Sequence, residues 1–225
     1  MGKQIPPPID GTLRKFSLRV PSVIYGCSGI LVFGKRIKSL VFSTDLAIIR
    51  NVNADAVLAV YPFTPQPIIT QSLLSASDIP VFTGIGGGLT KGMNVVKLAL
   101  FAELQGATGV VVNAPTEPDT IAKVAENIDI PVVATVVNDC GDYHDKIKSG
   151  ASILNVSAAL NTPELVKKIR TAYPEIAIMA TGGPTDESIE RTIEAGANAI
   201  TWTPPSSADI FREIMAAYRE NREHP

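Results

Sequence analysis

From residue 39 onward, short runs of hydrophobic residues alternate with longer amphipathic stretches. The runs are rich in β-branched residues, a pattern typical of parallel strands buried on both faces. The spacing between successive runs leaves room for one helical crossover each. The sequence therefore predicts eight strands, at 40–42, 56–60, 81–83, 110–112, 132–134, 153–156, 176–179 and 199–202.

The stretches between these runs have helical patterns. Residues 94–104 contain no helix breaker, and Gly106 follows as a stop signal. Thr162 is predicted to cap a later helix, with Pro163 at its first position. Ser207 is predicted to cap the last helix. The residues of that helix predicted to face inward are Ile210, Phe211 and Ile214.

Eight consecutive strand–helix units favour a single (β/α)₈ TIM barrel over an open, doubly wound sheet, which remains the alternative. We assign residues 39–225 to the barrel and residues 1–38 to an N-terminal extension. In that extension, hydrophobic and polar residues alternate over 16–20, and 23–33 is an apolar stretch interrupted by glycines. We expect it either to form a hairpin that closes the bottom of the barrel or to mediate a contact between subunits.

Composition narrows the functional classes. The chain has 225 residues, a net charge of −2 and a pI of about 5.7, which argues against a nucleic-acid-binding surface. Its two cysteines, Cys27 and Cys140, are expected to be reduced thiols. No apolar run is long enough to span a membrane, and residues 1–10 do not resemble a signal peptide. We therefore expect a cytoplasmic protein with no nucleic-acid or membrane partner.

In a TIM barrel, reactive groups follow the strands, because those loops share one rim. Three charged residues there are candidate catalytic groups: Asp45, Lys91 and Asp139. Asp45 could act as a general base, but its position fits a helix cap equally well. Asp139 could act on a substrate or serve as a turn residue before a glycine.

A second group of residues at strand ends is expected to bind the substrate. An aromatic pair, Tyr61 and Phe63, could wall a pocket or pack the loop that carries it. The polar residues expected to orient a substrate are Asn113, Asn138 and Asn155, and those expected to hold an anionic group are Thr181, Gly182 and Gly183.

The glycine-rich segment 83–92 is the most unusual stretch of the chain. Five glycines expose backbone N–H groups, and Lys91 adds a positive charge, so the segment could be an anion-holding loop or a mobile lid. A flexible surface loop is the alternative. The spacing matches neither a Walker A loop nor a dinucleotide-binding fingerprint.

The sequence offers little support for a metal or for a reactive cysteine. Cys140 has only His144 nearby in the sequence, and a passive thiol is the preferred interpretation. The only other histidine is His224, near the C-terminus. A histidine-ligated metal site is therefore not expected, and no cofactor is predicted.

Residues 180–183 (Ala-Thr-Gly-Gly) and 195–200 (Ala-Gly-Ala-Asn-Ala-Ile) resemble the phosphate-binding end of the ribulose-phosphate-binding barrel superfamily. The closest pattern is that of keto-deoxy-phosphogluconate aldolases and thiamine phosphate synthases. The resemblance implies that the N–H groups of Gly182 and Gly183 bind a phosphate together with the loop after strand 8. That loop departs from the pattern, because Pro204 and Pro205 have no N–H to donate and Asp209 would repel a phosphate.

By this resemblance, we expect an enzyme of lyase or isomerase type that acts on a small polar carbon compound, with or without a phosphate. No predicted strand carries a lysine, so Schiff-base aldolase chemistry is not expected. One alternative is a non-catalytic, ligand-sensing barrel. Another is a hydrolase that uses Asp45 or Asp139 to activate water. The expected partner is a small molecule, and a homodimer is the default assembly.

Overall fold

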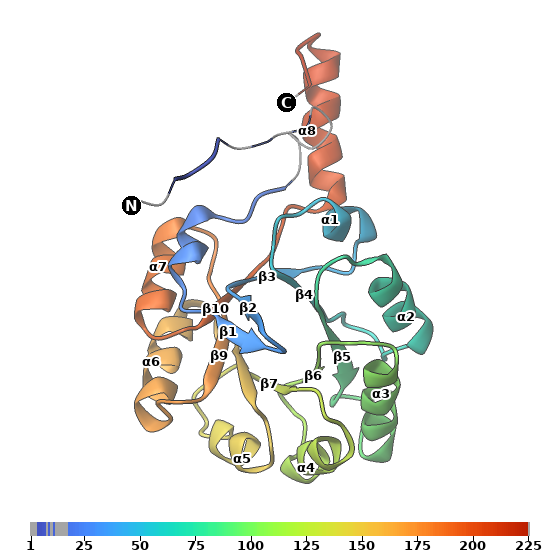
Figure 1. Cartoon of the computed structure of the whole chain (residues 1–225), viewed down its shortest axis with the longest axis vertical. Coiled ribbons are helices and arrows are strands. Elements are labelled where there is room, and N and C mark those ends of the chain that lie inside the picture. The colour runs from blue at the N-terminus through green and yellow to red at the C-terminus, as the bar shows by residue number, and fades with distance from the viewer. Residues whose placement is uncertain (1–3, 8, 10, 12–17, 225) are drawn as a thin grey trace.

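The structure is a computed structural model that describes residues 4–7, 9, 11 and 18–224. Eight parallel strands close into a barrel, with helices around the outside (Figure 1). The closed ring confirms the predicted (β/α)₈ TIM barrel and rules out the open sheet. Its strands, in order around the ring from β3, are β3 (Ser39–Phe42), β4 (Ala56–Ala59), β5 (Val81–Gly86), β6 (Gly109–Val112), β7 (Val132–Val136), β8 (Ile153–Val156), β9 (Ala177–Thr181) and β10 (Ala199–Trp202).

All eight predicted strands are present, because each run is buried between the barrel interior and the outer helices. Three strands extend further than the apolar runs suggested, to Gly86, Val136 and Thr181, because their last residues still pair with a neighbouring strand. The helices are α1 (Leu46–Arg50), α2 (Pro67–Ala76), α3 (Met93–Leu104), α4 (Pro118–Asn127), α5 (Tyr143–Lys148), α6 (Thr162–Ala172), α7 (Asp186–Glu194) and α8 (Ser207–Arg219).

Two predicted helix caps are wrong by one residue. Asn161, not Thr162, precedes α6, and the Thr162 hydroxyl instead accepts a hydrogen bond from the Ala158 N–H at 3.0 Å. Ser206, not Ser207, caps α8, because its hydroxyl accepts from the Asp209 N–H in a capping box. The Ser207 hydroxyl is thereby left to bond elsewhere.

A β-hairpin precedes the barrel and lies over the centre of the ring in Figure 1. Its strands, β1 (Ile30–Val32) and β2 (Lys35–Ile37), are joined by Phe33 and Gly34, whose φ angles are +46° and +80°. Ile30, Val32 and Ile37 are buried in one cluster with the lower interior side chains of the barrel. One face of the hairpin therefore packs against the end of the barrel at which the strands begin. In the 16–20 alternation, Phe16 lies outside the described residues, and Leu18 pairs with Val52.

The strand registers place the interior side chains in layers of four, each supplied by alternate strands. The two layers nearest the hairpin are wholly apolar. The next two mix apolar and polar residues and lead to the open end. From the hairpin outward, the layers are Ala56, Gly109, Ile153 and Ala199; Leu40, Phe82, Val133 and Met179; Leu58, Val111, Asn155 and Thr201; and Phe42, Gly84, Thr135 and Thr181.

Candidate functional site

The open end of the barrel, where the strands finish, has an interior divided into two halves. Strands β3 to β6 contribute Phe42, Leu58, Gly84 and Val111, which offer no side-chain hydrogen-bonding group. Strands β7 to β10 contribute the hydroxyls and amide of Thr135, Asn155, Thr181 and Thr201. We call these four residues the polar half. Ser157, directly after β8, joins them, because the Thr181 hydroxyl donates to its Oγ at 3.1 Å.

Two atoms of the polar half have no hydrogen-bond partner among the residues that the structure describes. The Oδ1 of Asn155 and the Oγ1 of Thr201 are both buried and unpaired, in residues that are 8% and 5% exposed. The two residues are neighbours in the same interior layer. An unpaired polar atom in such a place costs about 1–3 kcal/mol of stability, which argues for a purpose other than folding.

The sequence predicted Asn155 and Thr181 as ligand-binding residues, and the structure brings them together. It adds Thr201, Thr135 and Ser157, which sequence reasoning missed. Threonine is common in strands of every kind, so its identity alone gave no signal. The signal lay in the alternation, which places residues 199 and 201 on the same side of β10.

Asp45 lies at the rim after β3 and acts as the cap of α1. Its Oδ1 accepts hydrogen bonds from the N–H groups of Ala47 and Ile48 at 2.8 and 3.3 Å, and its Oδ2 accepts from the Ser207 hydroxyl. The Ser207 bond, together with these N–H groups, lowers the pKa of Asp45 despite some burial. A carboxylate held in this way is a weak general base at neutral pH.

Asp139 and Asn138 lie in the loop after β7, outside the barrel interior. Asp139 is exposed, and both of its oxygens accept from the Lys168 Nζ, at 2.7 and 2.8 Å. Asn138 is exposed too, and its Oδ1 accepts from the Cys140 N–H at 3.2 Å, as in a turn. Both residues line a separate cavity of about 280 Å³ against α6.

The glycine-rich segment divides into a buried part and an exposed part. Gly84 and Gly86 belong to β5, and Gly87 is buried behind them. Gly87 has a φ of +104°, and a Cβ there would overlap the Thr116 Oγ1 at 1.7 Å. This half of the segment is therefore packed strand and turn. Lys91 is exposed and lines a hollow of only about 20 Å³ beside Glu117.

Asn113 and the aromatic pair share another cavity at the rim, of about 300 Å³. Tyr61, Phe63 and Asn113 line it together with Gly88 and Leu89. The Tyr61 hydroxyl also accepts a hydrogen bond from the Gln66 N–H at 2.8 Å. This aromatic cavity adjoins the apolar half of the barrel mouth, because it lies over the ends of β4, β5 and β6.

Gly182 and Gly183 are explained by packing against α7. A Cβ on Gly182 would lie 2.7 Å from Ile189 and 2.9 Å from Ile200. Gly183 has a φ of +86°, and a Cβ there would meet the Ser188 Oγ at 2.6 Å. Thr181 and Gly183 do line a cavity of about 580 Å³, but its charged lining residue is Asp186, which repels an anion.

A buried lysine also escaped sequence reasoning. Lys146 on α5 is 2% exposed, and its Nζ donates to the Thr135 carbonyl oxygen at 2.9 Å and to the Asp142 Oδ2. The ion pair ties the loop after β7 to the outside of the barrel wall. Lys146 reaches β7 from a helix, so the prediction that no barrel strand carries a lysine is unaffected.

The described residues hold no group of three or more His, Cys, Asp or Glu side chains that could bind a metal. His144 contributes its Nδ1 to a 2.7 Å hydrogen bond with the Tyr173 hydroxyl, and Cys140 is exposed. Burial raises the pKa of the other cysteine, Cys27, to about 11, so its thiol is not a nucleophile at neutral pH.

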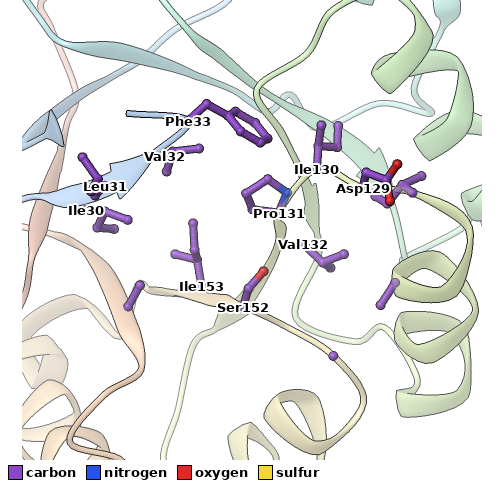
Figure 2. A pocket seen from close by; sticks show the side chains of 14 residues that line it. Ile30, Leu31, Val32, Phe33, Asp129, Ile130, Pro131, Val132, Ser152 and Ile153 are labelled. Carbon is purple, nitrogen blue, oxygen red and sulfur yellow. The ribbon is translucent and has the colours of Figure 1, made fainter. Parts of the chain in front are cut away.

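A further cavity, of about 420 Å³, lies at the opposite end of the barrel (Figure 2). Residues Ile30 to Phe33 of the hairpin face Pro131, Val132 and Ile153 across it. Among the described residues that line it, Asp129 and Ser152 have the only polar side chains. Active sites of TIM-barrel enzymes lie at the other end, so we do not place the functional site here.

No family model and no curated protein sequence matches the chain. Solved structures do share its fold. Phosphonopyruvate hydrolase superposes with a TM-score of 0.65 at 13% identity, covering 85% of each chain. Phosphoenolpyruvate phosphomutase from Streptomyces platensis subsp. rosaceus gives 0.62 at 13%, covering 82% of this chain and 83% of its own.

A third structure, 2,3-dimethylmalate lyase, is described as a member of the PEP mutase/isocitrate lyase superfamily. It gives a TM-score of 0.61 at 13% identity, covering 93% of this chain and 84% of its own. These similarities support the barrel fold. The superfamily named for that structure differs from the ribulose-phosphate-binding barrels that the sequence resembles, and at this identity the similarity establishes the fold alone.

Proposed function

We propose that the protein is a barrel enzyme of lyase or isomerase type that acts on a small polar carbon compound at the mouth of the barrel. The observation that carries the proposal is the pair of buried, unpaired atoms on Asn155 and Thr201, at the end where TIM-barrel enzymes bind substrates. The structures of similar fold include a lyase and a mutase, which favours this type of chemistry. A cytoplasmic location remains a prediction from the sequence.

The test is a search for turnover by the purified protein. The protein is incubated with a panel of small hydroxy, keto and phosphorylated compounds, and each reaction mixture is followed by NMR. We expect at least one of these compounds to be converted. Thr201→Val removes one unpaired hydroxyl without changing side-chain volume much, and it should reduce turnover at least tenfold. Lys168→Ala, far from the barrel interior, is the matched control. Conversion that is unaffected by Thr201→Val would contradict the proposal.

A ligand-sensing barrel without catalysis is the second candidate, and a specific observation favours it. Two of the three charged residues predicted to be catalytic have structural partners: Asp45 caps α1, and Asp139 pairs with Lys168. No charged residue occupies the four interior layers. A ligand that raises the Tm and depends on Thr201, with no turnover in either direction, would establish this alternative.

We also propose that the protein is a homodimer that pairs through α8. This helix projects away from the barrel (Figure 1), and among the described residues no other helix or strand makes extensive contact with it, although Ala217 is buried. Its exposed apolar residues, Phe211, Met215 and Tyr218, follow a helical spacing and form one stripe. A 13-residue helix is marginal without packing, and a symmetric second copy offers an identical stripe.

Light scattering after size-exclusion chromatography tests the dimer. We expect the wild-type chain to elute at twice its mass of 23.9 kDa. The double substitution Phe211→Glu and Met215→Glu should shift it to the monomer. Glu213→Lys, an exposed change on the other side of the same helix, is the matched control. A wild-type monomer at every concentration would overturn the proposal.

A further inference from the structure

The chemistry of the barrel mouth narrows the class of ligand that it can take. This inference rests on the proposed function only for the location of the site. The polar half presents hydroxyl and amide groups, which both donate and accept hydrogen bonds. The Thr181 hydroxyl donates to Ser157, whereas the Thr201 Oγ1 and the Asn155 Oδ1 have no partner. A ligand hydroxyl can donate to one of these atoms and accept from a neighbouring group.

The charges around the polar half are acidic or already paired. On the β9, β10 and β3 side lie the carboxylates of Asp45 and Asp186. Asp209, at the start of α8, pairs with Arg212 at 2.7 Å. The positive charges near β7 and β8 are engaged as well, since Lys146 bonds to Asp142 and Lys168 to Asp139.

Lys91 is a cation at the rim that forms no ion pair among the described residues. It lies beyond Gly87 and lines a hollow with Thr116 and Glu117, on the β5 and β6 side. It is therefore not on the side of the polar half. A phosphate or carboxylate that reached Asn155 and Thr201 would lose its hydration without gaining a cation, which disfavours its binding there.

The other half of the mouth is apolar. Phe42, Leu58 and Val111 face the interior there, and Gly84 leaves its layer open. A Cβ on Gly84 would lie 3.4 Å from the Val60 Cγ2, which is ordinary van der Waals contact, so the glycine leaves room for about one methyl group. These side chains offer apolar contact to the carbon skeleton of a ligand.

We propose that the barrel mouth binds an uncharged polyhydroxylated compound of sugar size, and that Asn155 and Thr201 bind its hydroxyl groups. The ligand's C–H face packs on the β3–β6 side, and its hydroxyls bond to the β7–β10 side. Phosphorylated and carboxylated analogues of the same skeleton are excluded, because the polar half supplies no positive charge to replace their water.

Paired ligands test this inference on the full-length protein. Free aldoses, ketoses and sugar alcohols of four to six carbons are compared with their monophosphates, with the matching sugar acids and with inorganic phosphate. Binding is measured by thermal shift and by ligand-observed NMR. We expect at least one uncharged compound to bind and its monophosphate to bind at least tenfold more weakly.

Two variants assign the binding to the polar half. Thr201→Val and Asn155→Leu remove the unpaired atoms, so each should fold at least as stably as wild type yet bind at least tenfold more weakly. Lys91→Ala should leave the binding of the uncharged compound unchanged. Asn155→Asp adds a negative charge to the polar half and should weaken binding of the uncharged compound.

The outcomes separate this inference from the proposed function. Preferential binding of phosphates or acids that still depends on Thr201 would overturn the uncharged class and leave the proposed site intact. If uncharged compounds bind with the same affinity to wild type, Thr201→Val and Asn155→Leu, the proposed site is overturned as well. If no uncharged compound binds at millimolar concentration, the inferred ligand class is overturned. Turnover of any compound would still support the proposal that the protein is an enzyme.

Discussion

The two ends of the barrel interior are built from the same alternating strands and yet contain different chemistry. At the hairpin end, two layers of apolar side chains meet Ile30, Val32 and Ile37, and this cluster holds no unpaired polar atom. At the open end, one half of each layer turns polar, and two buried atoms lack partners. One end follows the rules of a stable core, and the other departs from them.

The contrast indicates where the molecule gives up stability. Replacing a polar interior residue with an apolar one of the same shape is often neutral or stabilising. Natural proteins usually retain polar residues that lower stability in this way at their binding sites. The hairpin end should therefore be sensitive to the loss of apolar volume, and the open end should tolerate apolar replacements while losing function.

The largest effect is expected at the hairpin end. Ile37→Ala removes a side chain that is 1% exposed and should destabilise the protein by about 2–4 kcal/mol, measured by urea unfolding. Leu31→Ala, in the same hairpin but 62% exposed, is the control and should cost far less. Equal effects of the two substitutions would mean that the hairpin does not close the barrel.

A smaller effect is expected at the rim of the open end. Asp45→Ala removes the cap of α1 and should cost about 1 kcal/mol at neutral pH. The pKa of Asp45 is lowered from its ordinary 3.8 in the folded protein, chiefly by the Ser207 hydrogen bond. The charge therefore stabilises the fold above pH 3.8, and this contribution is lost as the pH falls through the lower folded value.

Asp45→Asn separates the charge from the cap. Its amide oxygen can still accept from the N–H groups at the start of α1, but it has no carboxylate to titrate. The stability difference between wild type and Asp45→Asn, measured by urea unfolding, should shrink as the pH is lowered from 7 to about 3. A difference that is constant over this range would show that the Asp45 charge does not contribute.

The strands were predictable from the sequence, and the composition of the layers was not. A run such as 110–112 indicates burial on both faces, but which face lines the barrel depends on the pairing register. Gly182 was predicted to approach a ligand, whereas Ile189 and Ile200 explain it by packing. The sequence likewise predicted that Ile210, Phe211 and Ile214 face inward on the last helix, but Phe211 is 65% exposed, because α8 projects from the barrel.

The sequence is equally uninformative about the charged candidates, because it does not reveal whether a carboxylate at a strand end is free or paired. Asp45 and Asp139 both followed predicted strands, and each has structural partners. The polar half was harder to predict, because it consists of ordinary strand residues whose meaning depends on their neighbours across the barrel. Asn155 was the exception, because an amide in a buried strand is unusual in itself.

The smallest effect is expected outside the barrel interior, in the loop after β7. Asp139 and Lys168 form an exposed pair, and hydrogen bonding to Asp139 raises the pKa of Lys168. Exposed pairs contribute little to stability, so Asp139→Asn should change the Tm by no more than about 2 °C. It should also leave ligand binding at Thr201 unchanged, because Asp139 lines a different cavity. A tenfold loss of turnover in Asp139→Asn with an unchanged Tm would instead return this residue to the catalytic machinery and move the working site from the barrel interior toward α6.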